Sequence, residues 1–298
     1  MSDKLSEANE CYNKADKYLK TGLLKWKPDF DLAANEYSRA ATCFKSLQMA
    51  DKCLDAHLKA ADCYLKNKSY FSAAKAYEQV AIVCKDMNNW DSMIKYLEQS
   101  CYLYREHGVV DTAALTLNRG AQMIESVKPE KAAEWYSQAS EVTMLEERPR
   151  QAAEYANKSV RIYLKLRRYE DAIEWLRKAM NHLLEADDRP SLGRLYVGLV
   201  LVELAHEDVV SAQKAFREGK SYIEDAEISY LTTLLDGFDQ MDATAIVTGL
   251  NSPFIKSLDN EYTKIARNLQ QKYAAKMKAN ESSSPSGGAV DEEAGAML

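Results

Sequence analysis

The sequence predicts an all-α protein built as a solenoid of helical hairpins, and three observations carry this prediction. Glycine and proline are scarce, at 11 and 6 of 298 residues, against usual shares of about 7% and 5%. Alanine is abundant, with 39 residues. Pairs of alanines also recur at a nearly constant spacing. A chain that is rich in alanine and poor in turn-forming residues has few places to reverse tightly, which favours long helices over a sandwich, a barrel or a Rossmann-type sheet.

The alanine pairs define a repeat. Three positions after the second alanine of each pair stands an aromatic or apolar residue, as in Ala33-Ala34 with Tyr37, Ala73-Ala74 with Tyr77, Ala113-Ala114 with Leu117, and Ala132-Ala133 with Tyr136. The second alanines of the main series fall at positions 34, 74, 114 and 153 and are therefore 40, 40 and 39 residues apart. Ala133 and Ala172 fall about halfway between members, so we expect the helix period to be half the spacing of the main series.

The physical basis of the repeat is close helix packing. Two small alanines let neighbouring helices approach, and the aromatic residue fills the groove beside them. The Ala-x-x-Tyr pattern is tetratricopeptide-like, but its spacing exceeds the length of that repeat, about 34 residues, which predicts longer helices or longer loops. Pro129, Pro149 and Pro190 are expected at helix boundaries, where a missing N–H is least harmful.

The repeat fades after about residue 220, which predicts three regions. Residues 1–220 form the hairpin solenoid. Residues 221–280 form a C-terminal helical bundle that caps the last hairpin, with an apolar pattern through Tyr262, Ile265, Leu269 and Tyr273. Residues 281–298 form a disordered acidic tail, by composition.

The sequence contains no recognisable arrangement of catalytic or metal-binding residues. None of the six cysteines (Cys11, Cys43, Cys53, Cys63, Cys84, Cys101) is in a C-x-x-C pair, so we expect them to be small buried hydrophobic residues in a reducing compartment. The four histidines are scattered, and no nucleotide-binding, zinc-protease or hydrolase motif is present. We therefore expect no enzyme, no cofactor and no metal. There is no apolar run of about 18 residues and no signal peptide, which favours a cytoplasmic protein.

Charge is distributed unevenly along the chain. The net charge is −6. Residues 221–255 hold six acids and residues 281–298 hold four, and neither stretch contains a lysine or arginine. The remainder has 39 bases against 35 acids, so a mildly basic body precedes an acidic end. This asymmetry predicts two different partners.

A loop near the N-terminus is a candidate membrane anchor. The segment 19–30 breaks the helical pattern at Gly22 and Pro28. Between them, Leu23, Leu24 and Trp26 alternate with Lys25 and Lys27, as suits apolar side chains at a lipid interface flanked by lysines. In the alternative interpretation, the two leucines finish the first helix and Trp26 packs on the second.

Two charged rows are candidate docking surfaces. Lys158, Arg161 and Lys165 share one helix face, with Arg167 and Arg168 at its end, and could attract an acidic helical partner. The second row, Asp236, Asp239 and Asp242 at intervals of three residues, suits a basic partner. The alternative for both is a solvated face.

The stretch YSRAATCFK (Tyr37 to Lys45), the alanine-pair hairpins at a spacing near 40 and the acidic tail with an apolar end together resemble the soluble NSF attachment proteins (SNAPs). The Trp-containing first loop and the body of the chain are most similar to the gamma form. The resemblance covers nearly the whole chain.

The resemblance implies an adaptor between a SNARE bundle, the NSF ATPase and a membrane. Proteins of this family coat an assembled four-helix, syntaxin-type SNARE bundle and recruit hexameric NSF, which pulls the bundle apart in vesicle transport and membrane fusion. The implied location is cytoplasmic and peripheral on Golgi, endosomal and vesicle membranes, with no nucleic-acid partner and no cofactor. The resemblance favours the functional interpretation of the loop and of the acidic end.

The family's functional positions transfer to particular residues of this chain. The membrane-contacting loop corresponds to Leu23, Leu24, Lys25, Trp26 and Lys27; the SNARE-binding bases to Lys158, Arg161, Lys165 and Arg168; and the NSF-binding residues to Asp236, Asp239, Asp242, Asp291, Glu292, Glu293, Met297 and Leu298. Two family lysine positions hold Glu154 and Leu115 here, which weakens the expected SNARE affinity or shifts it to the other bases. The family's tail leucine is next to last, whereas here Leu298 is last, so the register of the tail differs.

A different class of function is a general tetratricopeptide-type scaffold or co-chaperone that holds a peptide in its concave groove. That function requires a carboxylate clamp of lysine and asparagine residues at the shorter tetratricopeptide period, and neither the clamp nor the period is evident. ATP-dependent release of SNAREs would separate the two hypotheses.

Overall fold

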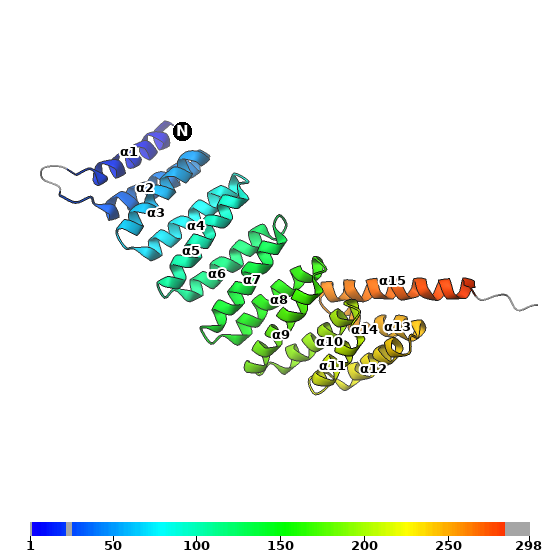
Figure 1. Cartoon of the computed structure of the whole chain (residues 1–298). Helices are drawn as coiled ribbons and strands as arrows, with labels where there is room; N and C mark the ends of the chain where they lie inside the picture. The colour runs from blue at the N-terminus through cyan, green and yellow to red at the C-terminus, as the bar shows by residue number, and fades with distance from the viewer. Residues whose placement is uncertain (1, 22–25, 284–298) are drawn as a thin grey trace, which may run out of the picture. The chain divides into compact units, whose positions relative to one another are not determined.

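A computed structural model describes residues 2–21 and 26–283 of the chain, and these residues contain helices and turns but no strand. The all-α prediction is confirmed. The helices are α1 (Ser2–Leu19), α2 (Phe30–Ser46), α3 (Ala50–Lys66), α4 (Tyr70–Asp86), α5 (Trp90–Glu106), α6 (Val110–Ile124), α7 (Pro129–Met144), α8 (Pro149–Lys165), α9 (Tyr169–Glu185), α10 (Arg189–Ala205), α11 (Val209–Gly219), α12 (Asp225–Asp239), α13 (Ala243–Leu250), α14 (Pro253–Lys256) and α15 (Asn260–Ser283) (Figure 1).

The helices from α2 to α11 begin at nearly constant intervals, each about half the spacing of the alanine pairs. This confirms the helix period predicted from the sequence. Pro129 and Pro149 begin α7 and α8, and Pro190 is the second residue of α10, so the expected helix boundaries are also confirmed. At all three positions the proline removes an N–H that would have no partner within the helix.

The turns between these helices repeat one backbone geometry. After α2, the N–H of Met49 bonds to the carbonyl of Phe44 at 3.0 Å, and Gln48 between them has a φ of 59°. This is the left-handed end of a Schellman motif. The equivalent left-handed residues are Gln48, Lys68, Asn88, Gly108, Glu147, Arg167, Asp187 and Glu207. The expectation that a glycine-poor chain has few tight reversals was wrong, because seven of these eight turn positions hold residues other than glycine.

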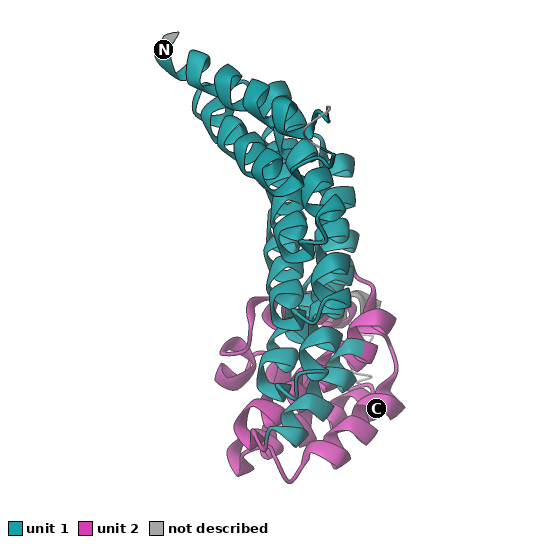
Figure 2. Cartoon of the chain, turned by 90° about the vertical axis from the view of Figure 1, so that its left-hand side faces the viewer, with its two compact units in different colours: residues 1–166, 175–186 teal, residues 167–174, 187–298 magenta. Residues whose placement is uncertain are grey.

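The chain divides into two compact units, residues 1–166 with 175–186 and residues 167–174 with 187–298 (Figure 2). The three regions predicted from the sequence stay a prediction. The regular alternation of helix and turn does not stop at the division, since α10 and α11 in the second unit keep it.

Helices of the first unit lie in two layers, and contacts between helices two places apart in the chain mark each layer. In the even layer (α2, α4, α6, α8), Thr116 of α6 donates to Glu78 of α4 at 2.7 Å. In the odd layer (α1, α3, α5, α7), the Nζ of Lys131 in α7 lies 2.7 Å from a carboxylate oxygen of Glu98 in α5. Consecutive helices pack across the two layers.

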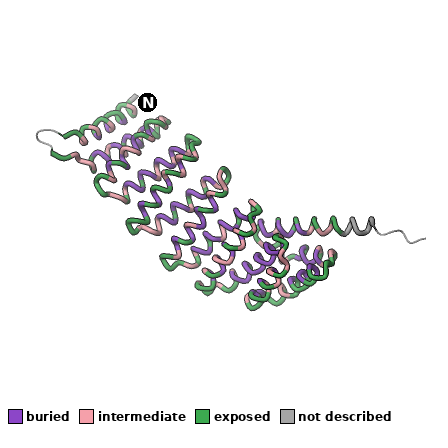
Figure 3. Tube along the Cα trace, in the orientation of Figure 1, coloured by how far each residue is buried: buried purple, intermediate pink, exposed green. Residues whose placement is uncertain are grey.

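The core of the first unit lies between these layers, where the alanine pairs are buried (Figure 3). Ala33 and Ala34 have no exposed surface, and Tyr37 one turn later is 1% exposed. They form one cluster with Ala15 of α1 and Cys63 of α3. The cysteines are free, five of them are buried and Cys43 is half-buried, so they behave as small apolar residues as expected.

The second unit is organised around α10, which is buried on nearly all sides from Leu192 to Leu204. Its Gly198 lies against α15 so closely that an added Cβ would come within 2.8 Å of the Tyr262 ring. Of the four residues in the predicted apolar pattern of α15, Tyr262, Ile265 and Leu269 are buried and Tyr273 is half-buried. α15 ends at Ser283, so residues 281–283 are helical where a disordered tail was predicted, and residues 284–298 lie outside the described part of the chain.

Candidate interaction surfaces

The predicted basic row lies mostly on α8, in the even layer. Lys158 is half-buried, and its Nζ donates to Oδ1 of Asn118 in α6 at 2.8 Å. The same Nζ lies 5.2 Å and 5.6 Å from the ring centroids of Tyr155 and Tyr136. Burial lowers the pKa of Lys158, more than the nearby carboxylate of Glu154 raises it. The ammonium is thus held by a neutral amide and two aromatic faces, and among the described residues it forms no ion pair with a carboxylate.

Lys165, about two turns after Lys158 on α8, has an acidic partner. Its Nζ lies 2.8 Å from Oε1 of Glu125, which follows α6. Glu125 also bonds to the hydroxyl of Tyr136, and burial together with this charged neighbour raises the pKa of Tyr136 to about 12. We name Lys158, Arg161, Lys165, Asn118 and Glu125 the α6–α8 basic cluster.

Sequence reasoning missed Asn118 and Glu125, although a signal for both was available. Asn118 is 40 residues before Lys158, and Glu125 is 40 residues before Lys165. The repeat period therefore brings each lysine beside the equivalent position of the preceding hairpin.

The other residues assigned to the basic surface differ in setting. Arg168 belongs to the second unit and bonds to Asp171 at 2.7 Å, so its charge is matched within its own turn of helix. Leu115 on α6 is 40% exposed and Glu154 on α8 is exposed. Both positions thus reach the surface of the even layer without adding positive charge.

The predicted acidic row does not lie on one helix. Asp236 and Asp239 are exposed on the last turn of α12, which ends at Asp239. Asp242 is the N-cap of α13, and its carboxylate accepts from the N–H groups of Thr244 at 2.8 Å and Ala245 at 3.1 Å. The even spacing in the sequence is therefore interrupted by a turn, and the third carboxylate already serves as a helix cap.

The N-terminal loop presents an exposed tryptophan. α1 ends at Leu19 and α2 begins at Phe30, and between them Trp26 is 88% exposed and Lys27 is exposed. The alternative in which Trp26 packs on the second helix was therefore wrong. Leu23, Leu24 and Lys25 lie outside the described residues, as do the predicted tail residues Asp291, Glu292, Glu293, Met297 and Leu298.

Residues 2–21 and 26–283 present the charged surfaces described above. They contain no group of three or more histidine, cysteine, aspartate or glutamate side chains that could hold a metal ion. None of the helices in these two ranges is both long and apolar enough to span a bilayer. The features that stand out are the basic cluster, the acidic turn and the exposed loop.

Comparison with known proteins decides the family. The sequence model described as "Soluble NSF attachment protein, SNAP" matches residues 6–278. The chain belongs to the SNAP family. The resemblance seen in its alanine hairpins is thereby confirmed.

Two gamma-soluble NSF attachment proteins are similar over most of their length. The one from Dictyostelium discoideum is 26% identical over 277 residues, which cover 90% of this chain and 86% of that protein. The one from Arabidopsis thaliana is 24% identical over 267 residues, covering 89% and 92%. Among solved structures, the apo form of RapI has a TM-score of 0.43 and 16% identity, with 93% of this chain and 87% of that chain covered.

Proposed function

We propose that this chain is an adaptor that binds assembled SNARE complexes and recruits and stimulates the NSF ATPase for their disassembly in vesicle transport and membrane fusion. The observation that carries the proposal is the SNAP family match across residues 6–278, together with the names of the similar gamma proteins. The chain acts through its surfaces and has no reaction of its own.

The α6–α8 basic cluster is the proposed SNARE-binding surface, and Arg168 in the second unit is a separate proposed contact. Within the cluster Lys158 carries the most weight, because its contacts are neutral and leave its charge to act on an acidic bundle. Electrostatic attraction of this kind speeds association and weakens with salt.

The acidic end is the proposed NSF-binding surface. Asp236 and Asp239 are exposed on α12 in a stretch without lysine or arginine, which supports docking to a basic partner. Asp242 and the tail residues Asp291, Glu292, Glu293, Met297 and Leu298 complete the proposed surface.

The N-terminal loop is proposed to place the adaptor on a membrane. The exposure of Trp26 beside Lys27 supports an interfacial anchor, with the indole among the headgroups and the lysine attracted to anionic lipid. The chain would then act in the cytoplasm, peripherally bound to Golgi, endosomal and vesicle membranes.

The double change Asp236→Lys/Asp239→Lys tests the proposal. Asp242 is left intact, because losing its helix cap would weaken α13 and obscure the result. We expect pull-down of NSF on SNARE-loaded adaptor to be lost while SNARE binding survives. The control reverses two exposed acids of the first unit, Asp51→Lys/Glu130→Lys, and should recruit NSF normally. Normal recruitment by the first variant would mean that α12 does not face NSF.

A further inference from the structure

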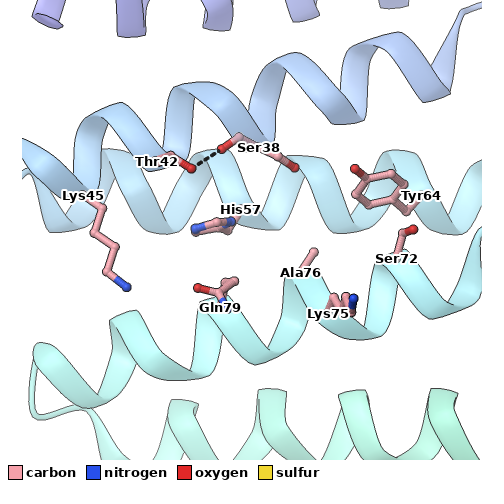
Figure 4. Close-up of a pocket in the computed structure, with 9 residues that line it drawn as sticks. All are labelled: Ser38, Thr42, Lys45, His57, Tyr64, Ser72, Lys75, Ala76 and Gln79. Atoms are coloured by element: carbon pink, nitrogen blue, oxygen red, sulfur yellow. Dashed lines mark hydrogen bonds between the residues drawn. The ribbon is translucent and has the colours of Figure 1, made fainter. Parts of the chain in front are cut away.

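A polar groove lies in the first unit, well apart in sequence from the α6–α8 basic cluster. It has a volume of about 440 Å³ and runs between α2 and α4, with α3 as its floor. Its lining residues are Ser38, Thr42 and Lys45 from α2, His57 and Tyr64 from α3, and Ser72, Lys75, Ala76 and Gln79 from α4. Figure 4 shows His57 between Lys45 and Lys75, with the two lysines entering from opposite helices.

The groove is positively charged and carries no counter-charge. Its lining contains two lysines and no carboxylate. Within the described part of the chain, neither ammonium forms an ion pair, and Lys75 lies 4.6 Å from the Phe71 ring centroid. Elsewhere in this unit, Lys131 and Lys165 each hold a neighbouring helix through an acid, Glu98 and Glu125, and Lys158 holds one through the amide of Asn118. Lys45 and Lys75 thus differ from the lysines that hold the layers together.

The groove offers neutral hydrogen-bonding groups on its floor and on its two sides. His57 is only 7% exposed, and no hydrogen bond to its ring is found among the described residues. Burial, and then the charge of Lys45, lower the pKa of His57 to about 4, so the imidazole is uncharged at neutral pH. Gln79 and the hydroxyls of Ser38, Thr42 and Ser72 add further polar atoms.

The spacing of the lysines selects the shape of the ligand. α2 and α4 run in the same direction, with Lys45 the sixteenth residue of the first and Lys75 the sixth of the second. At 1.5 Å per residue, the two backbone positions are about 15 Å apart along the groove. A helix would need about ten residues to cover that distance, and its backbone groups, already bonded within the helix, could not use the polar side chains of the groove. An extended chain instead spans about 13 Å in four residues and points residues i and i+4 to the same side.

We propose that this groove binds an extended acidic segment of a partner protein, with two carboxylates four residues apart. One carboxylate pairs with Lys45 and the other with Lys75. The residue midway between them faces His57 and Gln79 on the same side of the peptide. This site is additional to the proposed SNARE and NSF surfaces, and it requires neither of them.

A set of synthetic peptides tests the charge requirement. Fluorescein-labelled GSESTSESG carries two glutamates four residues apart, GSESESTSG moves them to two apart, and GSQSTSQSG replaces both with glutamine. Titration of the full chain by fluorescence anisotropy at low salt should show at least tenfold weaker binding of the glutamine peptide and intermediate binding of the close-spaced one. Equal binding of the glutamine peptide would overturn the proposal.

Variants of the chain test the location. Lys45→Met and Lys75→Met should each weaken binding of GSESTSESG at least fivefold. Lys45→Arg keeps the positive charge and should bind the peptide like the unchanged chain. The matched control is Lys95→Met on α5, an exposed lysine outside the groove. Unchanged thermal unfolding by circular dichroism would show that the variants are folded. If both methionine variants bind the peptide like the unchanged chain, the groove is not a peptide site, whatever becomes of SNARE and NSF binding.

Discussion

Replacing Glu125 by glutamine should strengthen binding of an acidic helical bundle. Glu125 holds Lys165 at 2.8 Å, and the two side chains are 37% and 47% exposed. An ion pair with this exposure contributes at most about 1 kcal/mol. An incoming carboxylate must displace Glu125 to reach Lys165. Removing the competing charge of Glu125 should therefore make the free energy of binding more favourable by up to the energy of the ion pair. This corresponds to an affinity up to about fivefold higher. Glutamine keeps a carbonyl oxygen to accept from Tyr136, so the fold should be retained.

The assay is equilibrium binding of a labelled SNARE bundle to the chain at two salt concentrations. The gain should be larger at low salt, because ions screen charges that are partly exposed. Glu141→Gln is the matched control, since Glu141 faces Lys178 at 3.7 Å on the opposite side of the same unit. The control removes the same charge and should leave affinity unchanged.

Two results would refute this reasoning. If Glu125→Gln binds the bundle no more tightly than the unchanged chain, Lys165 does not contact the partner. If both variants gain affinity for the bundle equally, the effect comes from net charge alone, and the α6–α8 basic cluster is not a specific binding surface. In either case Lys158 could still be tested separately, by Lys158→Met.

Two further predictions concern stability. Because burial lowers the pKa of His57 from 6.5 to about 4, between these values the unfolded chain is protonated there and the folded chain is not. The contribution of this group to the free energy of unfolding is therefore full above pH 6.5 and falls by about 3 kcal/mol as the pH drops to 4. His57→Asn should remove that part of the pH dependence, as measured by urea unfolding. Identical pH profiles for the variant and the unchanged chain would contradict the prediction. Lys68 has a φ of 57° at the turn after α3, so Lys68→Gly should stabilise by about 0.5–1 kcal/mol. Lys66→Gly, at the last residue of α3, also removes the ion pair with Asp62 at 2.6 Å and should destabilise by about 1 kcal/mol; a loss in both would show that the turn is unstrained.

Most of the fold could be predicted from local sequence. The alanine pairs located the buried faces of the helices, and Pro129, Pro149 and Pro190 located helix starts. These signals are local, because helix initiation and the spacing of a buried stripe depend on residues within one or two turns. The left-handed turns were missed for the converse reason. Residues such as Gln48 and Lys68 carry no glycine-like signal, and the packing of the flanking helices holds them in that conformation.

The candidate surfaces were predictable only in part. The bases of α8 could be read from their spacing, and so could the acids of α12. The side chains that pair with these charges could not be predicted, because a row of like charges in the sequence does not say which of them another helix neutralises. Asp242 likewise belonged to the row by spacing, but the end of α12 made it a helix cap.

The sequence by itself determined that the chain is a regular series of helices, which faces of them are apolar, and that a basic body precedes an acidic end. The tertiary structure decided which charges remain available. Stacking of successive hairpins brings positions 40 residues apart into contact, so Glu125 neutralises Lys165 while Asn118 leaves Lys158 charged. The same stacking leaves Lys45 and Lys75 facing one groove without an acid between them. Charge is a property of each residue, but its compensation depends on neighbours that only the packing of helices supplies.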